Sequence, residues 1–261
     1  MKIIHFNAFD GAVTGYIHES YEGLEAHAVR PALVVCPGGG YSFCSPRETD
    51  APAMRFFSIV YNVFILLYST GVGAYGLRPL RELAETVRIL RGKQEEFGID
   101  GHKIAVMGFS AAGHLAASLG ALHSNRSLPN PLPENCRPDA LVLAYPVITT
   151  GEYTHEETML NSTHGEAEFK DLLSIENHIT GDFPPAFLWH TWDDELVPLE
   201  NTLMLAAALR KQDINFEYHV FSHGAHGLST CDCEVDTPNR DCAVWIPLCQ
   251  SWLNNIFEFE P

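Results

Sequence analysis

The chain has 261 residues, of which 46% are hydrophobic and 19% are charged, so it can bury a sizeable core and is not a disordered chain. Its 33 Asp and Glu residues outnumber its 16 Lys and Arg residues, which argues against binding to nucleic acid or to an anionic membrane. No run of 18 apolar residues is present, so we expect no membrane-spanning segment.

The N-terminus and the cysteines bear on the cellular compartment. Residues 1–10 contain no long apolar run, so we expect no signal peptide. The seven cysteines are an odd number and form no Cys-x-x-Cys pair, which favours reduced thiols and a cytoplasmic location over a disulfide framework. Cys231, Cys233 and His226 lie close in sequence, but their spacing matches no common zinc site. We therefore expect no metal and no cofactor.

The first part of the chain alternates predicted strands with predicted helices. Apolar runs predict strands over residues 3–6, 13–18, 32–36 and 63–68. The last of these strands is apolar on both faces, as a central strand of a parallel sheet should be. Helical spacing of apolar residues predicts helices over residues 49–60 and 77–97.

Residues 103–114 read Lys-Ile-Ala-Val-Met-Gly-Phe-Ser-Ala-Ala-Gly-His and predict a strand, a sharp turn and a helix. Ser110 stands at the turn, where a "nucleophile elbow" presents a serine hydroxyl above a sheet. The usual pattern is Gly-x-Ser-x-Gly, and here Ala112 takes the last position while a glycine follows at Gly113. The alternative role for Ser110 is that of a helix N-cap, which is common after a strand.

The second part of the chain continues the alternation around a polar insertion. Strands are predicted over residues 141–145, 186–190 and 216–221, and helices over residues 199–211 and 245–256. We therefore predict a single α/β domain over residues 1–261, in which a mostly parallel sheet lies between two helical layers. Residues 149–185 are polar and only weakly helical, so they form either a lid over a site or a plain surface excursion.

A nucleophilic serine needs a histidine base and a carboxylate that orients the base. The segment His-Thr-Trp-Asp-Asp-Glu-Leu-Val-Pro follows a predicted strand, and its Asp-x-x-Val-Pro spacing favours Asp194 over Asp193. These acidic residues could instead cap the helix after Pro198, but they stand several positions too early for that role.

The candidate base lies on a later loop. The segment Phe-Ser-His-Gly-Ala-His-Gly-Leu follows the strand over residues 216–221 and offers His223 and His226. We favour His226, because it lies further out on the loop between two glycines that permit a tight turn. His114 and His219 are interpreted as packed residues of a helix and a strand.

Three glycines directly after the strand over residues 32–36 could supply N–H donors to a developing oxyanion. Gly38, Gly39 and Gly40, together with the residue after the nucleophile, Ala111, are the candidate donors. Binding of a phosphate group is the rival role for such a loop, but no Gly-Lys-Ser/Thr follows and Tyr41 comes directly after the glycines.

Taken together, these segments closely resemble the α/β-hydrolase carboxylesterases, in particular bacterial esterases and lipases related to acetyl-xylan esterases and hormone-sensitive-lipase-type enzymes. The resemblance runs from about Val13 to Leu253. It implies Ser110 as nucleophile, Asp194 as acid, His226 as base, and the N–H groups of Gly38, Gly39 and Ala111 as the oxyanion hole. Two positions depart from the pattern, because Pro37 stands where the lipase-type motif has His, and Ala112 where it has Gly.

We accordingly expect a serine carboxylesterase that hydrolyses small esters of acetyl or other short acyl groups, with acetylated sugars among the candidate substrates. An amidase or peptidase with the same triad, and a non-catalytic binding protein on the same fold, are the alternatives. A long-chain lipase fits less well, because residues 149–185 lack a broad apolar surface. The expected partner is a small-molecule ester. A homodimer is also compatible with the sequence, because the aromatic residues of the C-terminal helix suit either a core or an interface.

Overall fold

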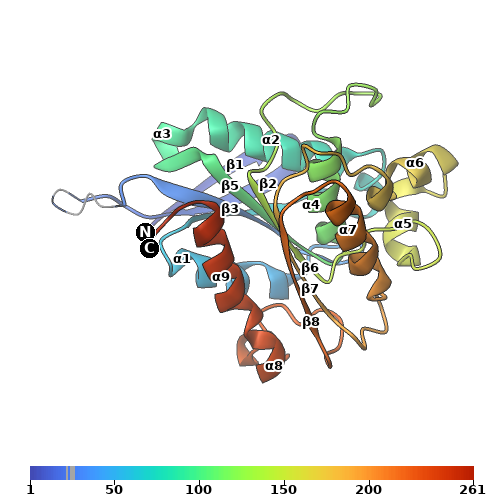
Figure 1. Ribbon diagram of the computed structural model, residues 1–261. Coiled ribbons are helices and arrows are strands. Elements are labelled where there is room, and N and C mark those ends of the chain that lie inside the picture. The colour runs from blue at the N-terminus through green and yellow to red at the C-terminus, as the bar shows by residue number, and fades with distance from the viewer. Residues whose placement is uncertain (22, 24–26) are drawn as a thin grey trace.

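An eight-stranded sheet lies at the centre of the protein (Figure 1). The computed structural model describes residues 1–21, 23 and 27–261. The strands are β1 (Lys2–Ala8), β2 (Gly11–Ile17), β3 (Arg30–Cys36), β4 (Asn62–Leu67), β5 (Ile99–Phe109), β6 (Ala140–Ala144), β7 (Ala186–Thr191) and β8 (Phe216–Phe221). Their order across the sheet is β1-β2-β4-β3-β5-β6-β7-β8. The pairs β1–β2 and β2–β4 are antiparallel and the remaining pairs are parallel, which confirms the prediction of a mostly parallel sheet.

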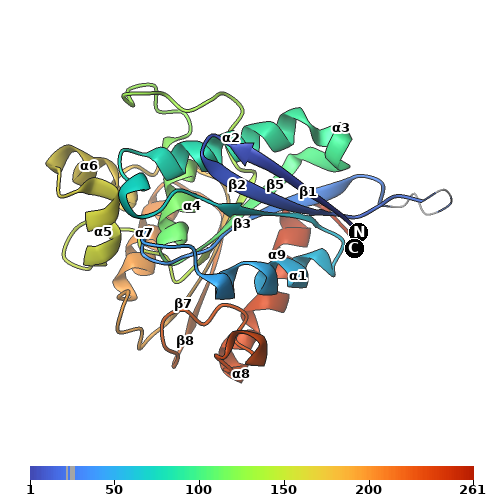
Figure 2. The same cartoon turned by 180° about the vertical axis from the view of Figure 1, so that it is seen from behind.

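Helices cover both faces of the sheet, as Figures 1 and 2 show from opposite sides. On one face lie α2 (Arg78–Gly92), α4 (Ala111–Leu122) and α7 (Glu200–Lys211), and on the other lie α1 (Asp50–Phe57) and α9 (Trp245–Ile256). The shorter helices are α3 (Gln94–Phe97), α5 (Glu156–Thr163), α6 (Ala167–Leu172) and α8 (Arg240–Ala243). The predicted three-layer arrangement is thus confirmed. Within the described residues, no helix has both the length and the apolar character needed to cross a bilayer.

Successive side chains of a central strand enter opposite layers of the core. Val106 of β5 packs among residues of α2 and α4, whereas its neighbours Ala105 and Met107 pack among residues of α1 and α9. All three side chains are fully buried. Because both faces of the strand are covered, the strand reads as a continuous apolar run rather than an alternating one.

Two predicted elements have different bounds in the structure. The single helix expected over residues 77–97 is divided, because α2 ends at Gly92 and α3 follows separately. Glycine has a low helix propensity, which is consistent with an end at this point. Strand β5 begins at Ile99, before the predicted strand-turn-helix segment that starts at residue 103, and its pairing with β3 shifts register between Arg30 and Ala32. The polar residues at this start of β5 gave no apolar signal.

The polar insertion over residues 149–185 forms α5, α6 and a short 3-10 helix (Ile175–Asn177) at the side of the molecule (Figure 1). One side of α5 is buried, as the low exposure of Thr158 and Met159 demonstrates. The far end of the insertion is tied to α4, because the Leu173 carbonyl oxygen lies 2.9 Å from Nε2 of His114. The insertion therefore packs against the sheet domain along part of its length.

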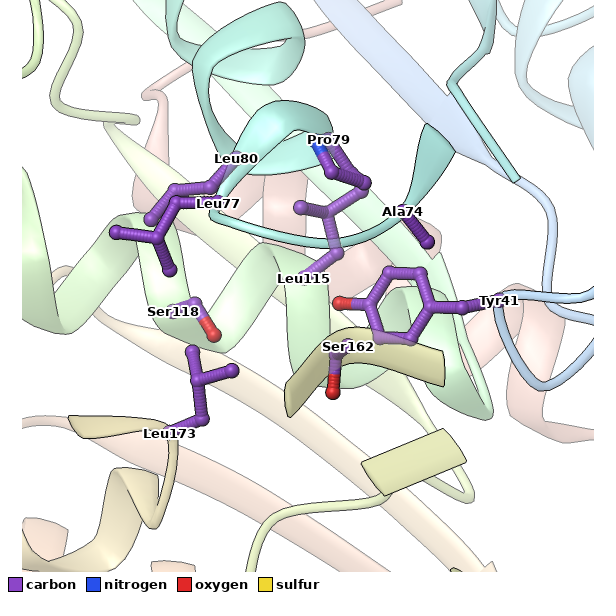
Figure 3. A pocket seen from close by; sticks show the side chains of 9 residues that line it. All are labelled: Tyr41, Ala74, Leu77, Pro79, Leu80, Leu115, Ser118, Ser162 and Leu173. Carbon is purple, nitrogen blue, oxygen red and sulfur yellow. The ribbon is translucent and has the colours of Figure 1, made fainter. Parts of the chain in front are cut away.

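A small internal gap separates the insertion from the sheet domain (Figure 3). It lies between Leu77 and Leu80 of the α2 region, Leu115 of α4, Ser162 of α5 and Leu173. Its volume is about 20 Å³, which is room for about one water molecule. The gap is too small for an ester substrate, and we interpret it as a packing defect beneath the insertion.

Candidate active site

Ser110 lies at the sharp turn between β5 and α4, with a φ of 55° and a ψ of −119°. A positive φ is strained for a residue other than glycine, and such strain is concentrated at functional sites. The backbone packs tightly here, because a Cβ on Gly108 would lie 2.1 Å from the Ala112 carbonyl oxygen. A Cβ on Gly113 would lie 2.6 Å from Cβ of Pro146. Positions 108 and 113 therefore require glycine, whereas position 112 accommodates the methyl group of Ala112.

His226 lies on the loop after β8 and contacts the serine directly. Its Nε2 is 2.8 Å from the Ser110 Oγ, and its Nδ1 is 2.7 Å from Oδ2 of Asp194. The carboxylate accepts only from a protonated Nδ1, so Nε2 is left to accept the serine hydroxyl proton. The ring of Tyr145 packs edge-on against the imidazole, with centroids 5.0 Å apart. The structure thus brings together the three residues that the sequence predicted.

Asp194 lies on the loop after β7, and its carboxylate receives several hydrogen bonds. The backbone N–H groups of Leu196 and Val197 donate to Oδ1, at 3.0 and 2.9 Å. Oδ2 accepts from His226 and also lies 3.2 Å from Nε2 of His190. Burial by itself would raise the pKa of Asp194, but the hydrogen bonds from His190, His226 and Val197 outweigh it and hold the pKa well below its usual range.

His190 contacts the Asp194 carboxylate, although its position in the sequence predicted only a strand residue. It is fully buried at the end of β7, and its Nδ1 accepts from the Thr202 hydroxyl at 2.5 Å. Its Nε2 lies 3.0 Å from the Val197 carbonyl oxygen and faces Asp194 as well. A lone histidine that closes an apolar strand four residues before the acid is the signal that could have identified it.

Asp193 and His223, the alternatives to Asp194 and His226, form a separate pair at the surface. Nδ1 of His223 lies 3.0 Å from Oδ2 of Asp193, and the Gly224 N–H donates to Oδ1 of the same carboxylate at 2.7 Å. The His223 side chain is 85% exposed. This pair joins the acid loop to the histidine loop. His114 is buried and hydrogen-bonded to Tyr41, as the packed interpretation of that residue predicted.

The glycine loop after β3 lies directly against the elbow, because a Cβ on Gly38 would lie 3.0 Å from Cβ of Ser110. The Gly38 N–H was expected in the oxyanion hole but donates instead to Oε2 of Glu48, at 2.8 Å. Over the described ranges, no acceptor is paired with the N–H groups of Gly39 or Ala111. Gly39 has a φ of 123°, and a Cβ there would lie 2.3 Å from the Phe43 carbonyl oxygen. Two of the three expected donors are thus free to bind an oxyanion.

A cavity of about 210 Å³ opens above the serine. Its lining includes Gly39, Phe43, Glu48, Ser110, Leu196 and His226. Residues His155 and Glu157 of the insertion also line it. Glu48 was not among the residues predicted for the site, although its buried carboxylate lines this cavity together with the serine and the histidine. In the part of the chain that the structure describes, no cluster of His, Cys, Asp or Glu side chains is arranged to hold a metal ion.

Residues 21–209 match the BD-FAE family. The chain is 37% identical over 213 residues to endo-1,4-beta-xylanase B of Butyrivibrio fibrisolvens, a match that covers 78% of this chain and 33% of that protein. It is 28% identical over 211 residues to an acetylxylan esterase of Xylanibacter ruminicola, covering 76% of this chain and 41% of that protein. The chain therefore spans about a third to two fifths of the length of these relatives.

A solved structure resembles the chain over most of its length. The acetyl ester-xyloside bifunctional hydrolase of Caldicellulosiruptor lactoaceticus is 33% identical, with a TM-score of 0.84. The comparison covers 96% of this chain and 89% of that one. Together with the strand order, this confirms the predicted α/β-hydrolase fold.

Proposed function

The chain belongs to the BD-FAE family, and from this premise we propose that it is a serine carboxylesterase that hydrolyses esters of acetyl and other short acyl groups. The observation that carries the proposal is the aligned row of three side chains. Ser110 Oγ lies 2.8 Å from His226 Nε2, and His226 Nδ1 lies 2.7 Å from a buried Asp194 carboxylate. This is the arrangement in which a histidine can remove the serine proton while a carboxylate stabilises the imidazolium that results.

In the proposed reaction, the Ser110 oxygen attacks the ester carbonyl carbon and its proton passes to Nε2 of His226. The carbonyl oxygen becomes an oxyanion, which the N–H groups of Gly39 and Ala111 stabilise by about 3 kcal/mol each. His226 then donates its proton to the departing alcohol, and an acyl-serine remains. A water molecule, deprotonated by His226, attacks this acyl group and releases the acid and free Ser110.

Two lines of support favour a short acyl group on a sugar alcohol. The cavity of about 210 Å³ suits a small acyl group, and the apolar side chains of Phe43 and Leu196 line it beside the serine. The names of the relatives include an acetylxylan esterase and an acetyl ester-xyloside hydrolase. We therefore propose O-acetylated sugars as the substrate class.

The role of Ser110 is tested by Ser110→Ala, with Ser118→Ala as the matched control. Ser118 lies on the same helix and donates to the His114 carbonyl oxygen, away from the cavity. We expect Ser110→Ala to lose turnover of p-nitrophenyl acetate and labelling by a fluorophosphonate, and Ser118→Ala to keep both. Retention of more than a few per cent of wild-type turnover by Ser110→Ala would sink the assignment.

The substrate class is tested by comparing ester series on the wild-type protein. We expect kcat/KM to fall steeply from p-nitrophenyl esters of two carbons to those of twelve, because the cavity is small. Acetylated xylo-oligosaccharides should be deacetylated, and aminoacyl amides should not be cleaved. Faster cleavage of the amides than of the esters would identify an amidase or peptidase instead.

A further inference from the structure

Glu48 is a buried carboxylate in the site for which the proposed reaction has no role. It ends a short 3-10 helix (Pro46–Glu48), is only 3% exposed, and lines the cavity together with Ser110 and His226. Within the described part of the chain, no Lys or Arg side chain forms an ion pair with it. Burying a carboxylate without a cationic partner is costly, so its hydrogen bonds must compensate.

Two donors hold the Glu48 carboxylate. The Gly38 N–H donates to Oε2 at 2.8 Å, and the Tyr145 hydroxyl donates to Oε1 at 2.7 Å. Burial raises the pKa of Glu48, although the hydrogen bonds from Tyr145 and Gly38 favour the charged form. Each oxygen thus serves a different donor, and both donors are themselves buried.

The same contacts connect the glycine loop to the histidine loop. The Tyr145 hydroxyl accepts from the Ser229 N–H at 2.9 Å, and the Ser229 hydroxyl donates to the Arg47 carbonyl oxygen at 2.6 Å. Ser229 lies three residues after His226, and the Tyr145 ring packs on the His226 imidazole. A chain of hydrogen bonds therefore runs from the glycine loop, through Glu48 and Tyr145, to the histidine loop that carries His226.

We propose that Glu48 is a positioning residue, which fixes the Gly38–Gly39 peptide segment so that the Gly39 N–H is preorganised for the oxyanion. The inference rests on the proposed esterase function, because an oxyanion forms only if Ser110 attacks a carbonyl. A fixed donor assists the transition state without reorganisation, whereas a loose one does not. Glutamine is a poor substitute, because its amide has one acceptor oxygen for two donors.

The test compares Glu48→Gln with a matched control, Glu82→Gln. Glu82 is also a buried carboxylate that accepts one backbone N–H and one hydroxyl, both from Ser69, but it lies on α2 and does not line the cavity. Active sites are titrated with a fluorophosphonate. We then measure kcat and KM for p-nitrophenyl acetate and the inhibition constant of 1,1,1-trifluoroacetone, which forms a tetrahedral adduct with a serine hydroxyl.

We expect Glu48→Gln to lower kcat per active site by about 10- to 100-fold, which is less than the loss for a whole oxyanion donor. KM should stay within about threefold, and the inhibition constant should rise by the same factor as kcat falls, because both depend on the oxyanion hole. Glu82→Gln should leave kcat and the inhibition constant within about twofold of wild type, although it also alters a buried carboxylate.

Tyr145→Phe provides a second variant in case Glu48→Gln does not fold. It keeps the ring against His226 and removes only the hydroxyl, and we expect a fall in kcat of about 3- to 10-fold with a matching rise in the inhibition constant. Unchanged kcat in whichever of these variants folds would overturn the role of Glu48, and so would a fall in kcat with an unchanged inhibition constant. A wild-type protein that neither turns over p-nitrophenyl acetate nor reacts with the fluorophosphonate would overturn the proposed function itself, and the role of Glu48 with it.

Discussion

At Asp194, hydrogen bonds from two backbone N–H groups and two histidines converge on one carboxylate. This full set of hydrogen bonds to the Asp194 carboxylate has two consequences. The carboxylate stays ionised, and it cannot rotate away from His226 without losing several bonds at once. The orientation and the tautomer of His226 are thereby fixed by residues of a single loop and by His190.

The choice between two adjacent acids leads to a first prediction. Asp194→Asn should lower kcat/KM for p-nitrophenyl acetate by about 10³- to 10⁴-fold, because an amide cannot hold the required imidazole tautomer. Asp193→Asn is the matched control, since it alters the neighbouring acid, whose carboxylate is hydrogen-bonded to His223 and Gly224 at the surface. We expect it to stay within a few-fold of wild type. Equal losses in the two variants would contradict the assignment of Asp194.

A second prediction concerns pH and stability. The folded-state pKa of Asp194 lies well below its usual value of 3.8, so its ionisation stabilises the folded protein above that pH. This contribution is lost as the pH falls through the folded-state pKa. The difference in free energy of unfolding between wild type and Asp194→Asn should therefore shrink as the pH falls from 5 to below 3.8. Urea titrations across this range measure it, and a difference that does not change with pH would refute the linkage.

The sequence was sufficient to assign residues to the candidate site where a local motif identifies them. It was not sufficient where the assignment depends on a tertiary contact. Spacing within one loop was enough to favour Asp194, and glycines around the histidine were enough to favour His226. The contact between Glu48 and the Gly38 N–H was not predictable, because it depends on how a 3-10 helix folds back on its own loop. His190 was missed because a histidine in a strand usually only fills space.

At the scale of elements, the turn between β5 and α4 combines a strained serine with two close approaches. Gly108 faces the Ala112 carbonyl and Gly113 faces Pro146, so the two glycines meet different obstacles. The usual Gly-x-Ser-x-Gly pattern has glycine at the position that Ala112 occupies in this chain. The structure explains this departure, because Pro146 excludes a side chain at position 113 and not at position 112.

The third prediction follows from this packing. Ala112→Gly should retain ester turnover within a few-fold and lower the free energy of unfolding by about 1 kcal/mol, the usual cost of glycine in a helix. Gly113→Ala should destabilise the protein by more than this, because its new methyl group would meet Pro146 at 2.6 Å. Thermal unfolding of both variants provides the measurement. A Gly113→Ala protein as stable as wild type would contradict the proposed packing.

At the scale of the whole molecule, the loops that carry Ser110, Asp194 and His226 all follow the carboxyl ends of parallel strands, and the insertion lies over one side of them. The alternation of strands and helices was sufficient to predict this layering. The position of the insertion was not predictable, since polar contacts between distant residues determine it. One such contact joins Asn161 of α5 to the Gly40 carbonyl oxygen, 121 residues away.

The contacts of Asn161 permit a test of whether residues 149–185 act as a lid. Its Nδ2 donates to the Gly40 carbonyl oxygen at 2.9 Å and to the Ser42 hydroxyl at 2.8 Å, which places α5 against the glycine loop. These bonds lie at the partly exposed mouth of the site, whereas the far end of the insertion is held by the buried bond to His114. Segments held by exposed polar bonds open at lower free energy than buried ones.

We therefore predict that the amides of α5 exchange with deuterium faster than those of α4, and that Asn161→Ala accelerates this exchange further. The variant should raise KM for an acetylated xylo-oligosaccharide several-fold, because it loosens a wall of the cavity. Glu168→Ala, an exposed position on α6, serves as the control. Equal exchange in α4 and α5, together with an unchanged KM in Asn161→Ala, would identify the insertion as a fixed surface segment instead of a lid.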